Sequence, residues 1–139
     1  MQLIVQAGDL GPKWFHIGLR AMVVIAKSNT LLNSTQIAEE LGAESTFLRK
    51  ILTRLAKNNL ICTYAGRYGG YELGKSSREI LVGDVYKALV STVSTPYYSV
   101  PPTGSEQFIS LIISKAEREF QATLDKYSIE DLVNNSNIN

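Results

Sequence analysis

The spacing of apolar residues predicts three short helices in the first half of the chain. Between about Pro12 and Asn29, apolar side chains recur every three or four residues, as one face of an α-helix requires, and proline suits the first helical position. The expected inward stripe of this helix consists of Phe15, Leu19, Met22, Val23 and Ala26. A second helix is expected after Asn33, and a third from about Ser45.

The second and third helices carry their own start and stop signals. Asn33, with Gln36 three residues later, resembles a capping box, and Gly42 ends the second helix after two turns. Asn59 can take the left-handed conformation that ends the third helix, whose inward residues are Leu48, Ile51, Leu52 and Leu55. Two short helices joined by a glycine-containing turn are typical of a helix-turn-helix, although such pairs also occur in plain interaction domains.

The segment that follows predicts a β-hairpin. Two β-prone runs, at residues 61–64 and 71–73, flank the glycine-rich basic stretch AGRYGG at 65–70. A basic hairpin directly after a recognition helix is a wing, and its glycines allow the backbone to approach phosphates closely. A further short helix is expected at 82–90.

The last part of the chain predicts one long helix, from Ser105 to about Lys126, after a proline-containing loop. Its apolar stripe consists of Ile109, Ile112, Ile113, Ala116, Phe120 and Leu124, with Phe108 and Leu111 beside it. A helix appended to a small domain cannot bury this stripe alone, so we expect it to pack against a second copy of the chain.

We therefore expect a mainly α fold with a small β-hairpin wing. The domain prediction is a winged helix-turn-helix DNA-binding domain in residues 1–92, a loop in 93–104, a dimerisation helix with a C-terminal segment in 105–133, and a frayed tail in 134–139.

The distribution of charge supports this interpretation better than the net charge of +1 does. Residues 45–78 contain seven basic residues and one acidic residue, a net charge of +6, whereas the segment from residue 104 onward has a net charge of −3. A basic half beside an acidic half indicates a nucleic-acid contact surface on the basic side.

The sequence also suggests where the protein acts. No apolar run approaches the roughly 18–20 residues of a membrane span, and the N-terminus does not resemble a secretory signal, so we expect a cytoplasmic protein. The single cysteine, Cys62, fits that location and excludes an intrachain disulfide.

Four strings together resemble the Rrf-two family of bacterial winged-helix transcriptional regulators. They are IAEELGA at 37–43, FLRKILTRLAKNNLI at 47–61, GRYGGYELGK at 66–75 and ILVGDVYKAL at 80–89. The ending YSIEDLV, at 127–133, also resembles the end of the family's long helix. The resemblance implies a dimer whose long C-terminal helices pack together and whose winged domains each bind one half-site of a palindrome.

The sequence departs from the family at two places. Many members hold an iron–sulfur cluster with three closely spaced cysteines before the long helix, but residues 93–104 contain none, so the chain resembles a cluster-free branch without a cofactor. Many members also place an arginine directly before the first wing glycine. Ala65 occupies that position here, which leaves Arg67 as the candidate for the minor groove.

The expected DNA contacts come from both helices of the helix-turn-helix and from the wing. Arg49 and Lys50 lie outside the apolar stripe of the recognition helix, where an arginine can bond a guanine edge. Arg54 and Lys57, further along, suit phosphate or structural contacts better than base contacts. The remaining candidates are Ser34, Thr35, Ser45, Thr46, Phe47, Arg67, Tyr68 and Gly69. Of these, Phe47 either contacts a thymine methyl or is partly buried in the domain.

Four other residues have a structural interpretation beside a functional one. Cys62 is a possible redox thiol but is expected to be a small buried apolar residue, as lone cysteines usually are. His16 is expected to be structural. Tyr97 and Tyr98 are expected to pack against the long helix rather than to line an effector site.

The sequence therefore predicts a homodimeric, sequence-specific DNA-binding transcriptional regulator, most simply a repressor. Its small-molecule or protein effector, if it has one, is unknown. An interaction module that kept the winged fold without binding DNA is an alternative. An enzyme is not expected, since the sequence has no phosphate loop, metal-ligand cluster or nucleophile elbow.

Overall fold

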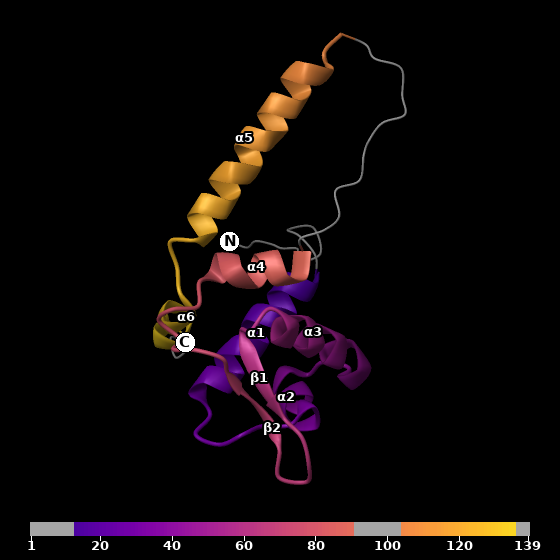
Figure 1. Ribbon diagram of the computed structural model, residues 1–139, viewed down its shortest axis with the longest axis vertical. Coiled ribbons are helices and arrows are strands. Elements are labelled where there is room, and N and C mark those ends of the chain that lie inside the picture. The colour runs from indigo at the N-terminus through magenta and orange to yellow at the C-terminus, as the bar shows by residue number, and fades with distance from the viewer. Residues whose placement is uncertain (1–12, 91–103, 136–139) are drawn as a thin grey trace.

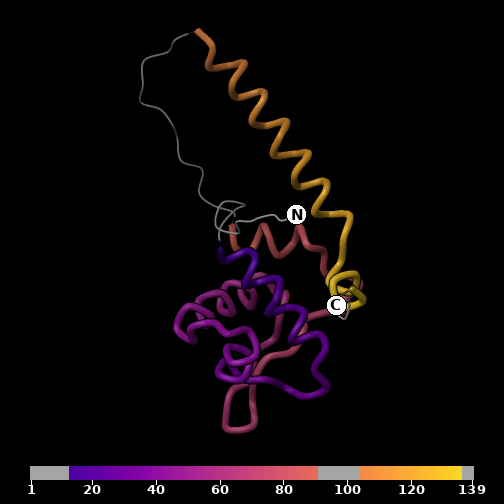
Figure 2. The backbone as a smooth tube through the Cα atoms, turned by 180° about the vertical axis from the view of Figure 1, so that it is seen from behind, coloured from indigo at the N-terminus to yellow at the C-terminus, as the bar shows by residue number. Residues whose placement is uncertain are grey.

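The computed structural model describes residues 13–90 and 104–135. A helical body with a two-stranded hairpin lies at one end, and one long helix extends away from it (Figure 1; Figure 2 shows the same arrangement from behind). The elements are α1 (Lys13–Lys27), α2 (Ser34–Leu41), α3 (Ser45–Lys57), β1 (Ile61–Tyr64), β2 (Gly70–Leu73), α4 (Val82–Val90), α5 (Glu106–Leu124) and α6 (Ile129–Asn135). This is the predicted mainly α fold with a hairpin wing.

Helix α1 buries a different face from the expected one. Gly18, Ala21, Met22 and Ile25 are its buried residues, so Met22 is the only fully buried member of the predicted stripe. Phe15, Leu19, Val23 and Ala26 are half-buried. The helix is apolar on most of its circumference, and spacing alone therefore does not select the face that meets the core.

The helix-turn-helix has the predicted caps. The side chain of Asn33 accepts a hydrogen bond from the amide of Gln36, and the Gln36 side chain accepts one from the Asn33 amide, so the capping box is complete. Gly42 ends α2 in the left-handed conformation, at φ +66°. Asn59 follows α3 with φ +64°, as expected. All four predicted inward residues of α3 are fully buried.

The wing is an antiparallel hairpin in which Cys62 lies opposite Glu72 and Thr63 opposite Tyr71. Its second strand also contacts the segment before α2, because the amide of Tyr71 donates to the carbonyl of Leu32 at 2.8 Å. This contact fixes the wing beside the start of the helix-turn-helix.

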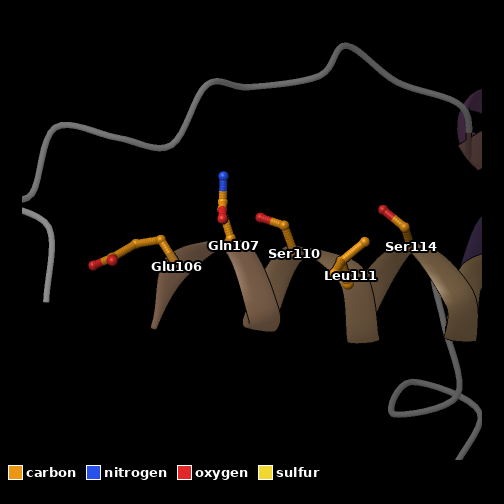
Figure 3. A pocket seen from close by; sticks show the side chains of 5 residues that line it. All are labelled: Glu106, Gln107, Ser110, Leu111 and Ser114. Carbon is orange, nitrogen blue, oxygen red and sulfur yellow. The ribbon is translucent and has the colours of Figure 1, made fainter. Parts of the chain in front are cut away.

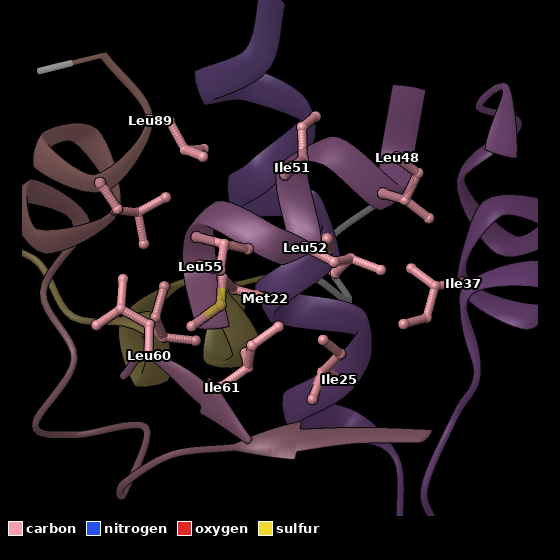
Figure 4. Close-up of a cluster of buried hydrophobic side chains, with 14 of the residues drawn as sticks. Met22, Ile25, Ile37, Leu48, Ile51, Leu52, Leu55, Leu60, Ile61 and Leu89 are labelled. Carbon is pink, nitrogen blue, oxygen red and sulfur yellow. The ribbon is translucent and has the colours of Figure 1, made fainter. Parts of the chain in front are cut away.

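One hydrophobic core joins these elements. Side chains from α1, α2, α3, β1 and α4 converge on it (Figure 4). Leu48, Ile51, Leu52 and Leu55 form the buried side of α3, so the opposite side of that helix faces outward.

The C-terminal segment differs from expectation. The chain turns after Leu124, so residues 127–133 are not the end of the long helix but enter a separate helix, α6. The amide of Ile129 donates to the carbonyl of Ile80, and the Ile129 side chain is fully buried in the core. Asn134 and Asn135, expected in a frayed tail, belong to the last turn of α6, where the Asn135 side chain donates through Nδ2 to the carbonyl of Asp131.

Among residues 13–90 and 104–135, the contacts that join helix α5 to the body lie near its C-terminal end. The Phe120 ring packs edge-on against Tyr86 of α4, and Gln121 donates to the carbonyl of Gly83. No residue of α5 is buried within the described part of the chain. Neither α5 nor any other helix described here is long and apolar enough to cross a bilayer.

Candidate nucleic-acid interface

The outward side of α3 is polar and basic. Thr46, Arg49, Lys50 and Lys57 are exposed there, opposite the buried leucines and isoleucine. Arg49 and Lys50 lie in the first half of the helix, as the side chains that read a major groove do. The structure therefore brings together the residues expected to make base contacts.

The start of α3 has a cap that the sequence analysis missed. The carboxylate of Glu44 accepts hydrogen bonds from the amides of Thr46 and Phe47, at 3.1 and 2.8 Å. These backbone bonds, that to Phe47 first, lower the pKa of Glu44. The signal was an acidic residue directly before the helix. Because the carboxylate already occupies these amides, they are not available to a phosphate. Ser45 beside them is half-buried.

Two of the proposed contact residues on α3 also contact other helices of the protein, and of these Arg54 is exposed. Phe47 is half-buried and meets Trp14 edge-on, with ring centroids 5.7 Å apart. The guanidinium of Arg54 lies 4.7 Å from the Trp14 ring centroid and donates to the carbonyl of Leu89. Phe47 therefore contacts α1, and Arg54 contacts both α1 and α4.

The wing tip lies close to the start of α2. Arg67 and Tyr68 are exposed at the tip, Tyr68 to 84%, and the Arg67 guanidinium lies 5.8 Å from the Tyr68 ring centroid. A polar hollow of about 190 Å³ separates the wing from α2, and its lining includes Ser34, Thr63, Gly69 and Arg67. Thr35 is exposed next to Ser34. Two expected contact regions thus meet across this hollow.

The acidic residue of the wing, Glu72, has a partner. The Tyr64 hydroxyl donates to its carboxylate at 2.7 Å, and this bond raises the pKa of Tyr64. The pair joins the two strands diagonally on the outer face of the hairpin. Sequence spacing gave no indication of it.

Cys62 and His16 are both exposed. The expectation that Cys62 is buried is wrong: it lies on the outer face of a hairpin only two strands wide, which nothing in the described residues covers. His16, expected to be structural, lines an open groove of about 370 Å³ between α1, Leu41 and Leu132. Tyr97 and Tyr98 lie outside the described residues.

Another hollow, of about 520 Å³, lies along the first half of α5 (Figure 3). Its lining consists of Glu106, Gln107, Ser110, Leu111 and Ser114. All five come from one helix, so the hollow has a single wall in the described part of the chain and does not enclose a ligand.

Comparison with protein families identifies this architecture. The profile of the Rrf2 family, described as an iron-dependent transcriptional regulator, matches residues 13–135. The chain belongs to the Rrf2 family. This is the Rrf-two family that the sequence motifs resemble, and its members are DNA-binding transcriptional regulators.

Solved structures share the Rrf2 fold. T. potens IscR is 22% identical, with a TM-score of 0.71 over 89% of this chain and 85% of that chain. CymR, the global cysteine regulator of B. subtilis, is 24% identical, with a TM-score of 0.66 over 96% and 98%. Staphylococcus aureus CymR is 25% identical, with a TM-score of 0.64 over 86% and 94%.

The donor set of this Rrf2 chain does not fit a cysteine-bound iron cluster. The whole sequence contains one cysteine and one histidine, whereas such clusters need several thiolates at one site. Within residues 13–90 and 104–135, no three His, Cys, Asp or Glu side chains gather where they could hold a metal ion.

Proposed function

We propose that this Rrf2 protein is a sequence-specific DNA-binding repressor that binds a palindromic operator as a homodimer, without an iron–sulfur cluster. The observation that carries the proposal is the exposed basic side of α3, with Arg49 and Lys50 opposite its buried face. We further propose a non-enzymatic role in the bacterial cytoplasm, where such an operator would be found.

The wing supports DNA binding from a second position. Arg67 and Tyr68 project from its tip, and Ser34 and Thr35 lie at the adjacent start of α2. In a winged helix bound in a major groove, such positions lie over the neighbouring phosphates or minor groove. We propose these residues, with Thr46, Lys50 and Lys57, as the phosphate contacts and Arg49 as the main base contact.

Dimerisation is supported by the apolar side of α5. Ile109, Ile112 and Ile113 are 49–52% exposed, and Phe120 is 43% exposed although it contacts Tyr86. An exposed apolar surface along a projecting helix is typical of a protein–protein interface. A second α5 would cover it in a two-fold dimer, and the two α3 helices would then lie in successive major grooves.

The test is selection of genomic DNA fragments by the purified protein, without added iron, at near-physiological salt. We expect enrichment of fragments that share a palindrome. Random enrichment, equal to that with a non-binding control protein, would rule out sequence-specific binding under these conditions.

A matched pair of double variants tests the assigned surface. Replacing Arg49 and Lys50 by Ala is expected to abolish specific binding, because both side chains lie on the exposed side of α3. The control, Lys87→Ala with Lys126→Ala, removes the same charge from exposed positions outside α3 and the wing. Equal loss in both variants would mean that only net charge matters.

A further inference from the structure

Arg54 lies on the recognition helix, and although the residue is exposed, its guanidinium contacts two other helices. Its Nη1 donates to the carbonyl of Leu89 at 3.0 Å, and its guanidinium lies over the ring of Trp14, 4.7 Å from the centroid. Leu89 belongs to the last turn of α4, whose carbonyls have no partners within their own helix and favour a cation. One side chain of α3 therefore contacts both α1 and α4.

Trp14 receives a second contact from the same side of α3. Phe47 lies two turns before Arg54 and meets the Trp14 ring edge-on at 5.7 Å. Residues seven apart lie on one side of a helix, so Phe47 and Arg54 hold Trp14 between them. The first turn of α1 is thereby fixed along the length of the recognition helix.

Phe15, the residue after Trp14 in α1, contacts α4 rather than α3. Phe15 meets Tyr86 of α4 edge-on, with centroids 5.1 Å apart, and Tyr86 meets Phe120 of α5 edge-on at 5.0 Å. Phe120 is in the apolar side of α5 that the proposed second copy would cover. Aromatic contacts thus run without interruption from α5 to the first turn of α1.

We propose that the first turn of α1 couples α5 to the recognition helix, and that Arg54 is a positioning residue rather than a DNA contact. The inference rests on the proposed function. Covering α5 with a second chain restricts Phe120 and Tyr86, Tyr86 restricts Phe15, and Trp14 with Arg54 then sets where α3 lies against the core. Arg54 acts on DNA recognition through this placement.

The test separates positioning from phosphate contact by salt dependence. Binding of the selected operator and of unrelated DNA is measured over a range of salt concentrations, at a temperature where circular dichroism shows folded protein. Arg54→Gln is expected to lower the ratio of operator to unrelated binding at least tenfold, with the salt slope unchanged. A lost phosphate contact would instead weaken both DNAs alike and reduce the slope by about 0.9. That result would overturn the proposal.

Two further variants keep the test independent of charge. Arg54→Lys retains the charge but loses the planar guanidinium. It is therefore expected to lower the ratio of operator to unrelated DNA binding, as Arg54→Gln does. If Arg54→Lys kept the wild-type ratio of operator to unrelated DNA binding, stacking of the guanidinium on Trp14 would have no role in positioning α3. Lys57→Gln, on the next turn of α3, removes a proposed phosphate contact and is the comparison: it is expected to weaken both DNAs alike and to reduce the salt slope by about 0.9, with the ratio kept.

Tyr86→Leu tests the path to α5 from a position on α4. We expect it to lower the operator ratio and to change the emission of Trp14, the only tryptophan in the sequence. Wild-type ratio and emission in this variant would overturn coupling through α4. If wild-type protein selects no operator, the proposed function fails first. If it selects one and these variants match it, only the coupling fails.

Discussion

Gly66 and Gly70 stand on either side of the wing tip, and both have positive φ, of +100° and +152°. They differ in what surrounds them. Nothing lies within 4 Å of the position that a Cβ would take at Gly66, whereas at Gly70 it would lie 2.6 Å from the carbonyl oxygen of Leu32. Glycine is therefore needed at position 70 because the wing lies close to the backbone of Leu32, just before α2. At position 66 glycine is needed only for the conformation of the turn.

This difference predicts the stability of two single variants. Gly66→Ala is expected to cost about 1 kcal/mol of unfolding free energy from backbone strain alone. Gly70→Ala adds a backbone clash to that strain, so its cost is expected to be about 3 kcal/mol or more. Urea unfolding followed by circular dichroism measures both. Equal costs would contradict the assigned contact with Leu32.

Single residues also show where sequence reasoning succeeds. Gly42 and Asn59 were predicted correctly because a left-handed helix end is a local requirement that few residues meet. The burial expected for Cys62 was wrong, and the contacts of Arg54 with Trp14 and Leu89 were not predicted. The position of Arg54 depends on Trp14, forty residues earlier, and the exposure of Cys62 depends on what covers the wing. The residues next to Arg54 and Cys62 in the sequence indicate neither the partner of Arg54 nor the exposure of Cys62.

At the scale of the element, α2 depends on its ends. It has only eight residues, too few to be stable alone, and its capping box satisfies amides that would otherwise lack partners. Because α2 orients α3 through the turn at Gly42, a frayed α2 start would also disturb the recognition helix.

The capping box predicts the effect of one substitution. Asn33→Ala removes the acceptor for the Gln36 amide and is expected to cost about 1 kcal/mol in unfolding free energy. Asn33→Ser keeps a capping oxygen and is expected to remain within a few tenths of a kcal/mol of wild type. Thermal and urea unfolding would compare the three proteins. The cap has no such role if Ala and Ser behave alike.

The elements were predicted more accurately than their packing. The bounds of α2, α3, the hairpin and α4 followed from caps, glycines and apolar spacing. The inward face of α1 did not, because that helix is apolar on most sides. Helix α6 was also missed, since it forms where Leu81 and Ser128 come together in a bridge between distant segments.

At the scale of the whole molecule, α5 places the proposed dimer contact away from the proposed DNA surface on α3 and the wing. The helix is held at one end by Phe120 and Gln121, and its apolar residues are exposed along most of its length. DNA affinity should therefore depend on a surface distant from any nucleotide, since two half-sites are bound together only by a dimer.

Ile112→Lys tests this dependence. Ile112 is 52% exposed in the single chain, and burying a lysine there is expected to raise the dimer dissociation constant on the order of 100-fold. Sedimentation velocity measures the assembly, and operator affinity should fall with it. Gln107→Lys makes the same change of charge on another side of α5 and is expected to remain dimeric. Wild-type assembly by Ile112→Lys would exclude α5 as the interface.

The exposed thiol of Cys62 makes the wings themselves measurable. It is the only cysteine in the sequence and lies on β1 away from the core, so a nitroxide reagent would attach at one position per chain. A dimer would then carry one spin on each wing, and dipolar spectroscopy would give the separation of the two spins directly. Operators whose half-sites differ in spacing could be ranked by how far they move the wings from their separation in solution.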